Sequence, residues 1–506
     1  MHGWPFDWLY PLRTPIILAP NLPSRRVTTR AHRVDWIAKG IWMPTIDGAV
    51  VPKDSVGSSG NGLRYTSIAC IYVFAGLSPL SITLGQLAQF GMLIITVIVV
   101  VSHWRGVIRS PVFWIAVAFV AYVVLRGFSA AFFEQPSLSS AHLDETGNWF
   151  RILALPILIL AMALVATGDW MRHAVWALVA TALGFLLFEV LPTWSWEDFF
   201  QALTGTSRYI FGMGHSRSAL ALGAMLIGLL MFVPALLLGS GSSQRSPETR
   251  MVVLRASGIA LLAALLLMAV FVTKSRTGWL SLIVALSVVA IVLVWYFHRE
   301  LRRPSVLGGL LVVTGLIASG VHFAWDEVER RTMERADAIG QILAMKSLQD
   351  AWEFEDPNVG ARGAYKVFAM QLWLDRPLTG WGPADPYHMM DERPLPPVLE
   401  GRSGHFHDAH VELLSRFGGI GYALMIALFV AIIWEAIRQI RSRSRTDRVG
   451  LGLAFTTIGF VPFMLVAMLG TYFLDSFKQI HLYTMFLAPM AAAALARHIN
   501  APPADR

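Results

Sequence analysis

Charged residues are scarce in this chain. Asp, Glu, Lys and Arg make up 15% of its 506 residues, whereas hydrophobic residues make up 55%, and the mean hydropathy is +0.55. This balance excludes an ordinary soluble protein of this size and indicates an integral membrane protein. Cysteine is nearly absent too, because Cys70 is the single one and lies in an apolar run. A disulfide framework and a cysteine-ligated metal site are therefore excluded.

The common motifs of soluble enzymes are also missing. The sequence contains no G-x-x-x-x-G-K, no H-E-x-x-H and no C-x-x-C. It also has no D-x-D of the kind that holds a metal against a nucleotide-sugar diphosphate. We therefore expect no metal and no cofactor, and we predict no nucleic-acid partner.

Long apolar runs dominate the rest of the chain. A helix needs about 20 apolar residues to cross the hydrocarbon of a bilayer, and we predict an all-α polytopic membrane protein with about 12 such helices. The predicted spans are 65–82, 83–101, 111–126, 149–167, 170–190, 217–238, 252–272, 277–297, 305–324, 418–437, 449–473 and 479–497.

Arginine placement predicts the orientation of these spans. The short loops on the side of the N-terminus carry Arg105, Arg109, Arg172, Arg245, Arg250, Arg255, Arg299, Arg302, Arg303, Arg438, Arg441, Arg443, Arg445 and Arg448. The positive-inside rule assigns that side to the cytoplasm, and an even number of spans puts both termini there. One large loop is then left on the outer, periplasmic face.

The predicted organisation has five parts. The N-terminal part lacks a clean apolar stretch and is rich in arginine, so we expect a cytoplasmic tail rather than a cleavable signal peptide. The parts are a cytoplasmic tail (1–64), transmembrane helices 1–9 (65–324), a large periplasmic loop with helical segments (325–417), transmembrane helices 10–12 (418–498) and a second cytoplasmic tail (499–506).

Cations stand where two outer-face helices are predicted to begin. His215 and Arg217 follow a glycine-rich turn into one span, and Lys274 and Arg276 lie in the short turn before another. A helix N-terminus carries partial positive charge and unpaired N–H groups, so cations there are unfavourable unless an anion lies between them. A shared anionic ligand such as a phosphate explains the pattern. The alternative is that these side chains reach ordinary lipid phosphates.

A third helix start carries a histidine cluster, "GHFHDAH" (404–410). We expect Asp408 to be the N-cap of a short amphipathic helix. His407 would then be kept neutral by the helix N-terminus and could accept a proton. The alternative is that the histidines are solvated loop residues, which we favour for His405; for His410 both interpretations stay open.

The same short helix is predicted to end before the next span. Glu412 and Arg416 are spaced to pair on its wet side, and Gly418 and Gly419 should break it. Arg362, in the amphipathic stretch "ARGAYKVFAMQLWLDRP", is either a residue that helps to close the loop over a ligand or part of a solvated face.

Three of these motifs resemble those of the O-antigen ligase family. The segment from His407 and Asp408, across nine residues, to "GGIG" resembles the family's histidine signature. "SRTGWL" (275–280) resembles its Arg-x-x-x-Leu element, and "RPLTGWGPADPYH" (376–388) resembles the Pro-Leu-x-Gly-x-Gly turn of its periplasmic loop. Asp408 departs from the pattern, since the residue after the histidine is usually Asn, Ser or Gln.

The resemblance implies a metal-independent, inverting glycosyltransferase of GT-C type in the bacterial inner membrane, acting at the periplasmic face. It would move a preassembled glycan from undecaprenyl diphosphate to a hydroxyl of the lipid A core in lipopolysaccharide biosynthesis. Arg217 and Arg276, helped by Lys274, would hold the diphosphate, and His407 would be the base. His410, Asp408, His215 and Arg362 are possible accessory residues, and membrane lipids surround the protein.

Two alternatives stay open. A polymerase of O-antigen or exopolysaccharide, or a protein O-oligosaccharyltransferase, would use the same donor and the same signature, with a glycan or a protein as acceptor. A flippase or other transporter of lipid-linked glycans needs a continuous polar path, yet charged residues near span centres are scarce. The sequence therefore favours a transferase with a site at the outer face.

Overall fold

The computed structural model describes residues 58–153, 160, 169–205, 207–238, 249–297, 357–384, 388, 399, 405–471 and 477–499, with eight single residues between 315 and 350. Throughout this part of the chain the regular elements are helices and no strand occurs, which confirms the predicted all-α class. The α-helices are α1 (Ser58–Leu77), α2 (Ile82–Ser102), α3 (Trp104–Val107), α4 (Pro111–Ser129), α5 (Ser139–Leu153), α7 (Trp170–Phe185), α8 (Trp196–Thr204), α9 (His215–Leu238), α10 (Thr249–Val272), α11 (Arg276–Phe297), α14 (Pro357–Asp375), α16 (Ala409–Ser442), α17 (Arg448–Met468) and α18 (Phe477–Ile499). Four short helical segments of other types are η1 (Ala130–Glu134), η2 (Pro136–Leu138), η3 (Leu186–Val190) and η4 (Leu191–Thr193).

Nine helices in the described part are long and apolar enough to cross a membrane. Each coincides with a predicted span, so the chain is an integral membrane protein. The predicted span 65–82 corresponds to α1, whose apolar part, Gly62–Leu77, is shorter than these nine. Predicted spans 149–167 and 305–324 lie mostly outside the described residues. The count of twelve and the large loop stay predictions.

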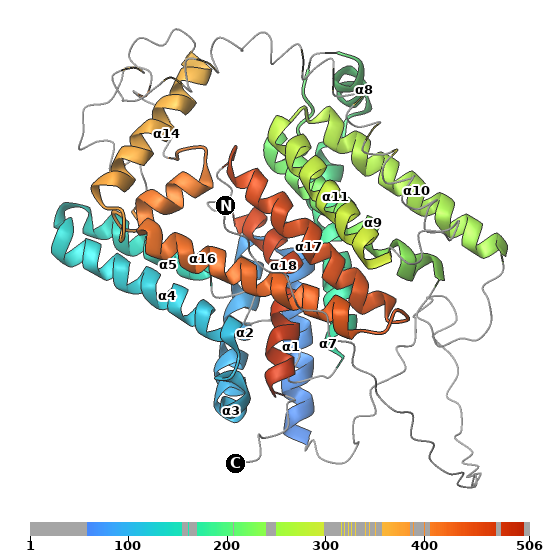
Figure 1. Ribbon diagram of the computed structural model, residues 1–506, viewed down its shortest axis with the longest axis horizontal. Helices are drawn as coiled ribbons and strands as arrows, with labels where there is room; N and C mark the ends of the chain where they lie inside the picture. The colour runs from blue at the N-terminus through green and yellow to red at the C-terminus, as the bar shows by residue number, and fades with distance from the viewer. Residues whose placement is uncertain are drawn as a thin grey trace, which may run out of the picture. The chain divides into compact units, whose positions relative to one another are not determined.

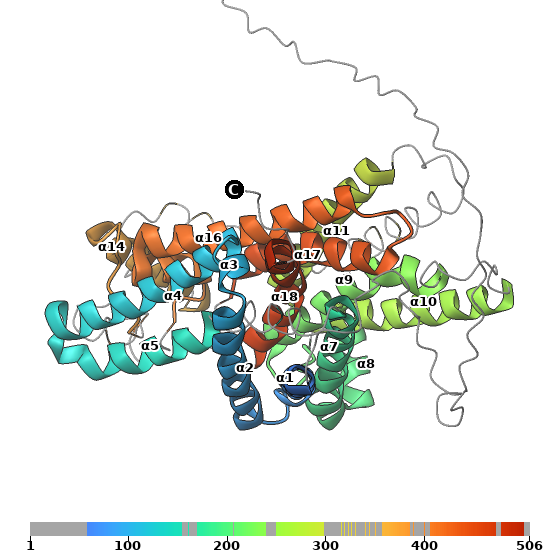
Figure 2. The ribbon, with the colours of Figure 1, turned by 90° about the horizontal axis from the view of Figure 1, so that it is seen from below.

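The helix α17 lies in the interior of the bundle. Most of its side chains are buried, and it packs against α9, α11, α16 and α18. In Figures 1 and 2 it lies between α16 and the group formed by α9, α10 and α11. Gly459 lets α17 approach Val289 of α11 and Ile227 of α9 closely, because a Cβ at this position would collide with both side chains.

Helices at the margin of the bundle expose large apolar side chains along one face. In α2, for example, Leu87, Phe90, Val97 and Val101 are all exposed. In a membrane protein such a face meets lipid hydrocarbon rather than water, so it needs no protein partner.

On the other side of α16 lies a group made of α4, α5 and α14 (Figure 1). Here α4 packs against both α5 and α16, and α14 packs against α16. A small apolar core joins α14 to the segment before α16 through Tyr365, Phe368 and Phe406. This packing places one face of α14 against the histidine cluster.

Candidate active site

The first turn of α16 is organised by Asp408. Its backbone is extended, with φ −148°, and its carboxylate accepts the N–H groups of His410 at 3.0 Å and Val411 at 3.2 Å. These bonds satisfy two of the unpaired donors at the helix start. The predicted N-cap is therefore confirmed.

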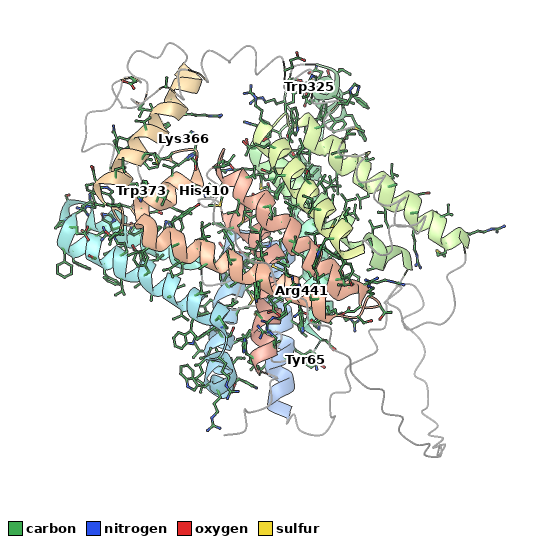
Figure 3. All side chains as sticks on the ribbon, in the orientation of Figure 1. Tyr65, Trp325, Lys366, Trp373, His410 and Arg441 are labelled. Carbon is green, nitrogen blue, oxygen red and sulfur yellow. The ribbon has the colours of Figure 1, made fainter. Side chains whose placement is uncertain are left out.

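Lys366 of α14 was not singled out in the sequence, yet it binds the same cap. Its ammonium lies 2.7 Å from the Asp408 carboxylate and donates to the carbonyl of Leu469, just after α17, at 3.1 Å. Figure 3 shows Lys366 and His410 near one another, between α14 and the start of α16. A lysine on an amphipathic helix has no sequence signal that separates this role from a solvated one.

His407 has an unusual backbone. Its φ is +56°, a left-handed value that only Lys274 shares among the described non-glycine residues. Its N–H donates to the His405 ring at 3.3 Å, and its own ring lies 4.2 Å from the His405 ring and 5.9 Å from that of Tyr365, between centroids. Strained residues of this kind cluster at functional sites.

The His407 ring is neutral at neutral pH. Burial lowers its pKa to about 4, and positive charge on His405 and Arg362 acts in the same direction. We expected a neutral ring because of the helix N-terminus; the structure assigns the main cause to burial instead. Arg362 is exposed on α14, one turn before Lys366.

His410 differs from His407 because both of its ring nitrogens have partners. Nε2 lies 2.8 Å from the Leu465 carbonyl, which can only accept, so Nε2 carries the proton. Nδ1 then accepts from the Tyr422 hydroxyl at 2.9 Å. In this arrangement His410 links α16 to α17 and has no ring lone pair left to receive a proton.

The pair Glu412 and Arg416 forms as predicted, but it does not lie on a wet side. The side chains are 2.6 Å apart and only 0% and 2% exposed. Arg416 also donates to the Pro383 carbonyl at 2.7 Å, and Glu412 accepts the Phe406 N–H at 3.3 Å. The predicted location was wrong because the turn after α14 covers this face of α16.

That turn, residues 376–384, is joined to α16 through backbone contacts. Gly418, with φ +62°, breaks the helical backbone inside α16, as predicted. At this kink Gly419 and Ile420 donate to the carbonyls of Pro377 and Leu378, while Trp381 and Gly382 donate to those of Ser415 and Arg416. We call this the glycine clasp. It joins the two glycine-containing motifs, which lie apart in the sequence.

The clasp needs glycine on both sides. Gly380 has φ +65°, and a Cβ there would collide with the backbone of Arg416 and Gly418. A Cβ on Gly418 would collide with the backbone of Leu378 and Thr379. Neither position can therefore accept a side chain without a backbone shift.

Arg126 of α4 holds the clasp from the other side. Its guanidinium donates to the carbonyls of Thr379 at 3.0 Å and Gly380 at 2.7 Å, and it pairs with Glu134. The Tyr122 hydroxyl donates to the Phe417 carbonyl at 2.7 Å. Sequence analysis missed Arg126, whose only signal is a charged residue at the end of a predicted span.

His142 of α5 supports the end of the turn. Its Nδ1 accepts the Ala384 N–H at 3.1 Å, so Nε2 donates to Gln135 at 2.8 Å. Burial lowers the pKa of His142 to about 4, which keeps Nδ1 free of a proton and able to accept.

The predicted starts of the two other helices are confirmed. The helix α9 begins at His215, after Gly212 and Gly214 with φ of +69° and +82°, and α11 begins at Arg276. Neither has an acidic residue in its first turn. Arg217 lies in the first turn of α9.

Lys274 is buried just before α11, at 5% exposure. Its ammonium donates to the Gly205 carbonyl, so it ties the end of α8 to the turn between α10 and α11. His215, in turn, has a ring nitrogen 3.4 Å from the guanidinium of Arg208.

Close contacts bring the three helix starts to one end of the bundle. A Cβ on Gly278 would collide with Ala219, so the first turns of α11 and α9 touch. Gly470, after α17, lies equally close to Thr277 of α11. Because the carbonyls of Leu465 in α17 and of Leu469 just after it bind His410 and Lys366, the end of α17 links Arg276 to the histidine cluster.

The opposite ends of α11 and α16 also lie together. Arg441 stands over the Trp295 ring at 5.7 Å, and Arg445 over the Tyr296 ring at 5.4 Å. The starts of α11 and α16 are both linked to the end of α17, and their ends lie together, so the two helices cross the bundle in the same sense. Arg276 and His407 therefore share one side of any membrane that these helices cross.

The site combines basic side chains, a neutral imidazole and helix N-termini. Within the described part of the chain, no group of three or more His, Cys, Asp or Glu side chains could hold a metal ion. Such an arrangement can bind an anion and accept a proton.

One family model matches the chain. Residues 261–426 match the model described as O-antigen ligase. The match runs from α10 to α16 and includes Lys274, Arg276, the glycine clasp and His407, whereas Arg217 lies before it. No curated protein matches the chain.

Proposed function

Residues 261–426 place the chain in the O-antigen ligase family, whose members are membrane proteins that act on lipid-linked glycans, and from this premise we propose that it is an O-antigen ligase. It transfers a preassembled polysaccharide from undecaprenyl diphosphate to a hydroxyl of the lipid A core, with inversion at the anomeric carbon and without a metal. The site faces the periplasm from the inner membrane, and both termini are cytoplasmic.

The proposed step forms one bond and breaks one. The acceptor hydroxyl oxygen attacks the anomeric carbon of the donor sugar and passes its proton to His407. The bond from that carbon to the diphosphate oxygen breaks, and undecaprenyl diphosphate leaves with the electron pair. The negative charge that develops on the leaving diphosphate requires cationic groups and N–H donors nearby.

Arg217 and Arg276 are proposed to supply that charge at the starts of α9 and α11, where helix N–H groups point at the same anion. The contact of Gly278 with Ala219 supports this assignment, because each arginine lies two residues before one of these two residues. Lys274, whose ammonium binds the Gly205 carbonyl, is proposed to shape the turn and to add positive potential. His215 and Arg362 extend the basic lining.

The observation that carries the proposal is the state of His407. It is the neutral histidine of the cluster whose backbone is strained, and it stands at an N-terminus linked by contacts to both arginines. A polymerase would share this chemistry and differ only in its acceptor, the end of another lipid-linked glycan. The product therefore decides between the two.

The test is His407→Gln in the purified full-length protein. A positioned base typically contributes about 10²- to 10⁴-fold, so transfer should slow by that order. Binding of undecaprenyl diphosphate should stay at the wild-type level, since glutamine removes the base and leaves the arginines. Donor and lipid A core extracted from the producing cells serve as substrates, and transfer and binding are measured separately.

The matched control is His103→Gln, because His103 is exposed and lies between α2 and α3. It should transfer at the wild-type rate. A wild-type rate in His407→Gln would remove the assignment of the base. A lengthened lipid-linked glycan, in place of glycosylated lipid A core, would identify a polymerase.

A further inference from the structure

We propose that Lys366 is a positioning residue for His407, acting through the Asp408 cap. This inference rests on the proposed role of His407 as the base. Lys366 does not face the reacting atoms in this scheme. It pairs with the carboxylate of the N-cap residue of α16 and fixes that carboxylate to the end of α17.

The geometry joins three elements at one ammonium group. Lys366 extends from α14, lies 2.7 Å from the Asp408 carboxylate at the α16 N-cap, and donates to the Leu469 carbonyl after α17 at 3.1 Å. Its side chain is 41% exposed, whereas that of Asp408 is 4% exposed. The carboxylate is therefore the buried partner, and the lysine reaches it from the surface.

A buried carboxylate needs a counter-charge that a neutral cap does not need. An Asn, Ser or Gln side chain could accept the N–H groups of His410 and Val411 without bringing a charge. Asp408 adds a full negative charge at 3% residue exposure, which is costly unless paired. Lys366 supplies the pair, so the departure from the usual residue at this position is compensated from α14.

The link to His407 is the backbone. His407 is held at φ +56° between two fixed points, the Phe406 N–H bound to Glu412 and the capping carboxylate of Asp408. If Asp408 turns away from the helix N-terminus, one of the two points is lost. The strained conformation of His407 then relaxes, and its ring leaves its place beside Tyr365.

One turn of α14 presents three residues to His407 and its neighbour Asp408. Arg362, Tyr365 and Lys366 are three and four residues apart and so project from the same side of the helix. Arg362 and Tyr365 act on His407 itself, through charge and ring contact, and Lys366 acts on the residue that follows it. The sequence predicted either a loop-closing role or a solvated face for Arg362. Its electrostatic effect on His407 is neither of these.

The test compares Lys366→Met, Asp408→Asn and the double variant in the purified full-length protein, with the transfer assay described above. Lys366→Met leaves the Asp408 charge buried without its partner, and we expect the rate at saturating donor to fall between about tenfold and hundredfold, the loss typical of a catalytic group displaced by about 1 Å. The half-saturating donor concentration should stay within about threefold. Asp408→Asn keeps a capping oxygen and should retain most of the rate.

The double variant separates positioning from a general loss of packing. It removes both charges and keeps the cap, so its rate should return to within about threefold of wild type. The pH profile provides a second readout. In Lys366→Met the unpaired carboxylate next to His407 favours the protonated ring, so the acid limb of the rate should move to higher pH, and in the double variant it should move back.

The chain offers a matched control at the other end of α17. Asp447 caps α17 through the Gly450 N–H at 2.9 Å and pairs with Arg443. A capping carboxylate thus again has a cationic partner, but here the carboxylate is 31% exposed and lies at the end of α17 away from Leu465 and Leu469. Arg443→Met, Asp447→Asn and their double variant should leave the transfer rate and its acid limb unchanged.

Each outcome decides the inference. A wild-type rate in Lys366→Met would overturn it, and so would a loss of rate that persists in the double variant. In either case a slow His407→Gln would leave the proposed function standing. Equal losses in the Arg443 series would also overturn the inference. A wild-type rate in His407→Gln would overturn both proposals together.

Discussion

His407 differs from its histidine neighbours in what surrounds its ring. His410 has a partner at each nitrogen, and His405 accepts the His407 N–H. His407 has ring contacts with His405 and Tyr365 and a backbone that strain singles out. At the scale of single residues, the packing around a histidine ring, rather than its place in the sequence, distinguishes the proposed base from its neighbours.

The low pKa of His407 gives a prediction for pH. A general base must be neutral, and because burial lowers this pKa to about 4, the ring loses its proton as the pH rises through about 4. The value of kcat/KM, which reports groups of the free enzyme, should therefore rise through pH 4 and stay level from about 5 to 8. The measurement is a profile of initial rates with donor well below saturation. An acid limb near 6.5, the ordinary value for histidine, would show that the ring is solvated.

Some of this residue-scale detail could be predicted and some could not. Asp408 as the N-cap followed from local chemistry, because a cap bonds to residues two and three positions ahead. The partners Lys366, Tyr365 and Leu465 come from other helices, and no local pattern encodes them. The pairing of Glu412 with Arg416 was predictable from spacing, whereas its burial depends on the turn after α14.

At the scale of elements, the glycine clasp is the contact that fixes α16 at the site. It gives a prediction for glycine substitutions. Gly418→Ala and Gly380→Ala each put a Cβ at positive φ and into backbone atoms of the partner segment. Backbone strain of this kind costs about 1–3 kcal/mol, and the collision adds to it.

Both variants should lower the temperature at which the detergent-solubilised protein aggregates, and both should reduce transfer. The matched control is Gly258→Ala in α10, where nothing lies within 4 Å of the added Cβ and alanine favours the helix. It should be neutral or slightly stabilising. Gly418→Ala with wild-type stability and activity would show that the clasp opens without consequence.

Element boundaries were predictable where a polar or glycine-rich turn gives way abruptly to an apolar run. The helices α9, α11 and α16 begin where apolar runs follow glycine turns or a capping residue, and their starts were placed to within a few residues. The docking of residues 376–384 onto the kink was not predictable, because backbone hydrogen bonds carry no side-chain signature. Arg126 could be seen as a charge at a span end, but the two clasp carbonyls that it binds lie more than 250 positions away in the chain.

At the scale of the whole molecule, the paired ends of α11 and α16 support one orientation of the bundle. Arg441 and Arg445 lie over Trp295 and Tyr296 at one end, and His407 and Arg276 lie at the other. Arginine-rich loops face the cytoplasm, so the site should face the periplasm. Hydropathy alone predicted nine of the spans, because their length and composition are local properties.

Reporter fusions test this orientation. An alkaline phosphatase reporter, which is active only in the periplasm, should be inactive after Arg172, Arg303 and Arg448 and active near residue 360. The physical reason is the excess of arginine in the loops that contain Arg172, Arg303 and Arg448. Reporter activity after Arg448 together with none near residue 360 would show that the bundle has the opposite orientation, with the site on the cytoplasmic side.

Arg126 binds residues that lie far along the chain, and this separation bears on the order in which its partners are synthesised. The chain is made from its N-terminus, so α4 enters the membrane long before residues 379 and 380 exist to accept from this guanidinium. A charged side chain in hydrocarbon needs a partner at once, and Glu134 stands eight residues further along the same span. Glu134 is therefore synthesised together with Arg126, whereas the two carbonyls of Thr379 and Gly380 that also bind this guanidinium follow only after α14.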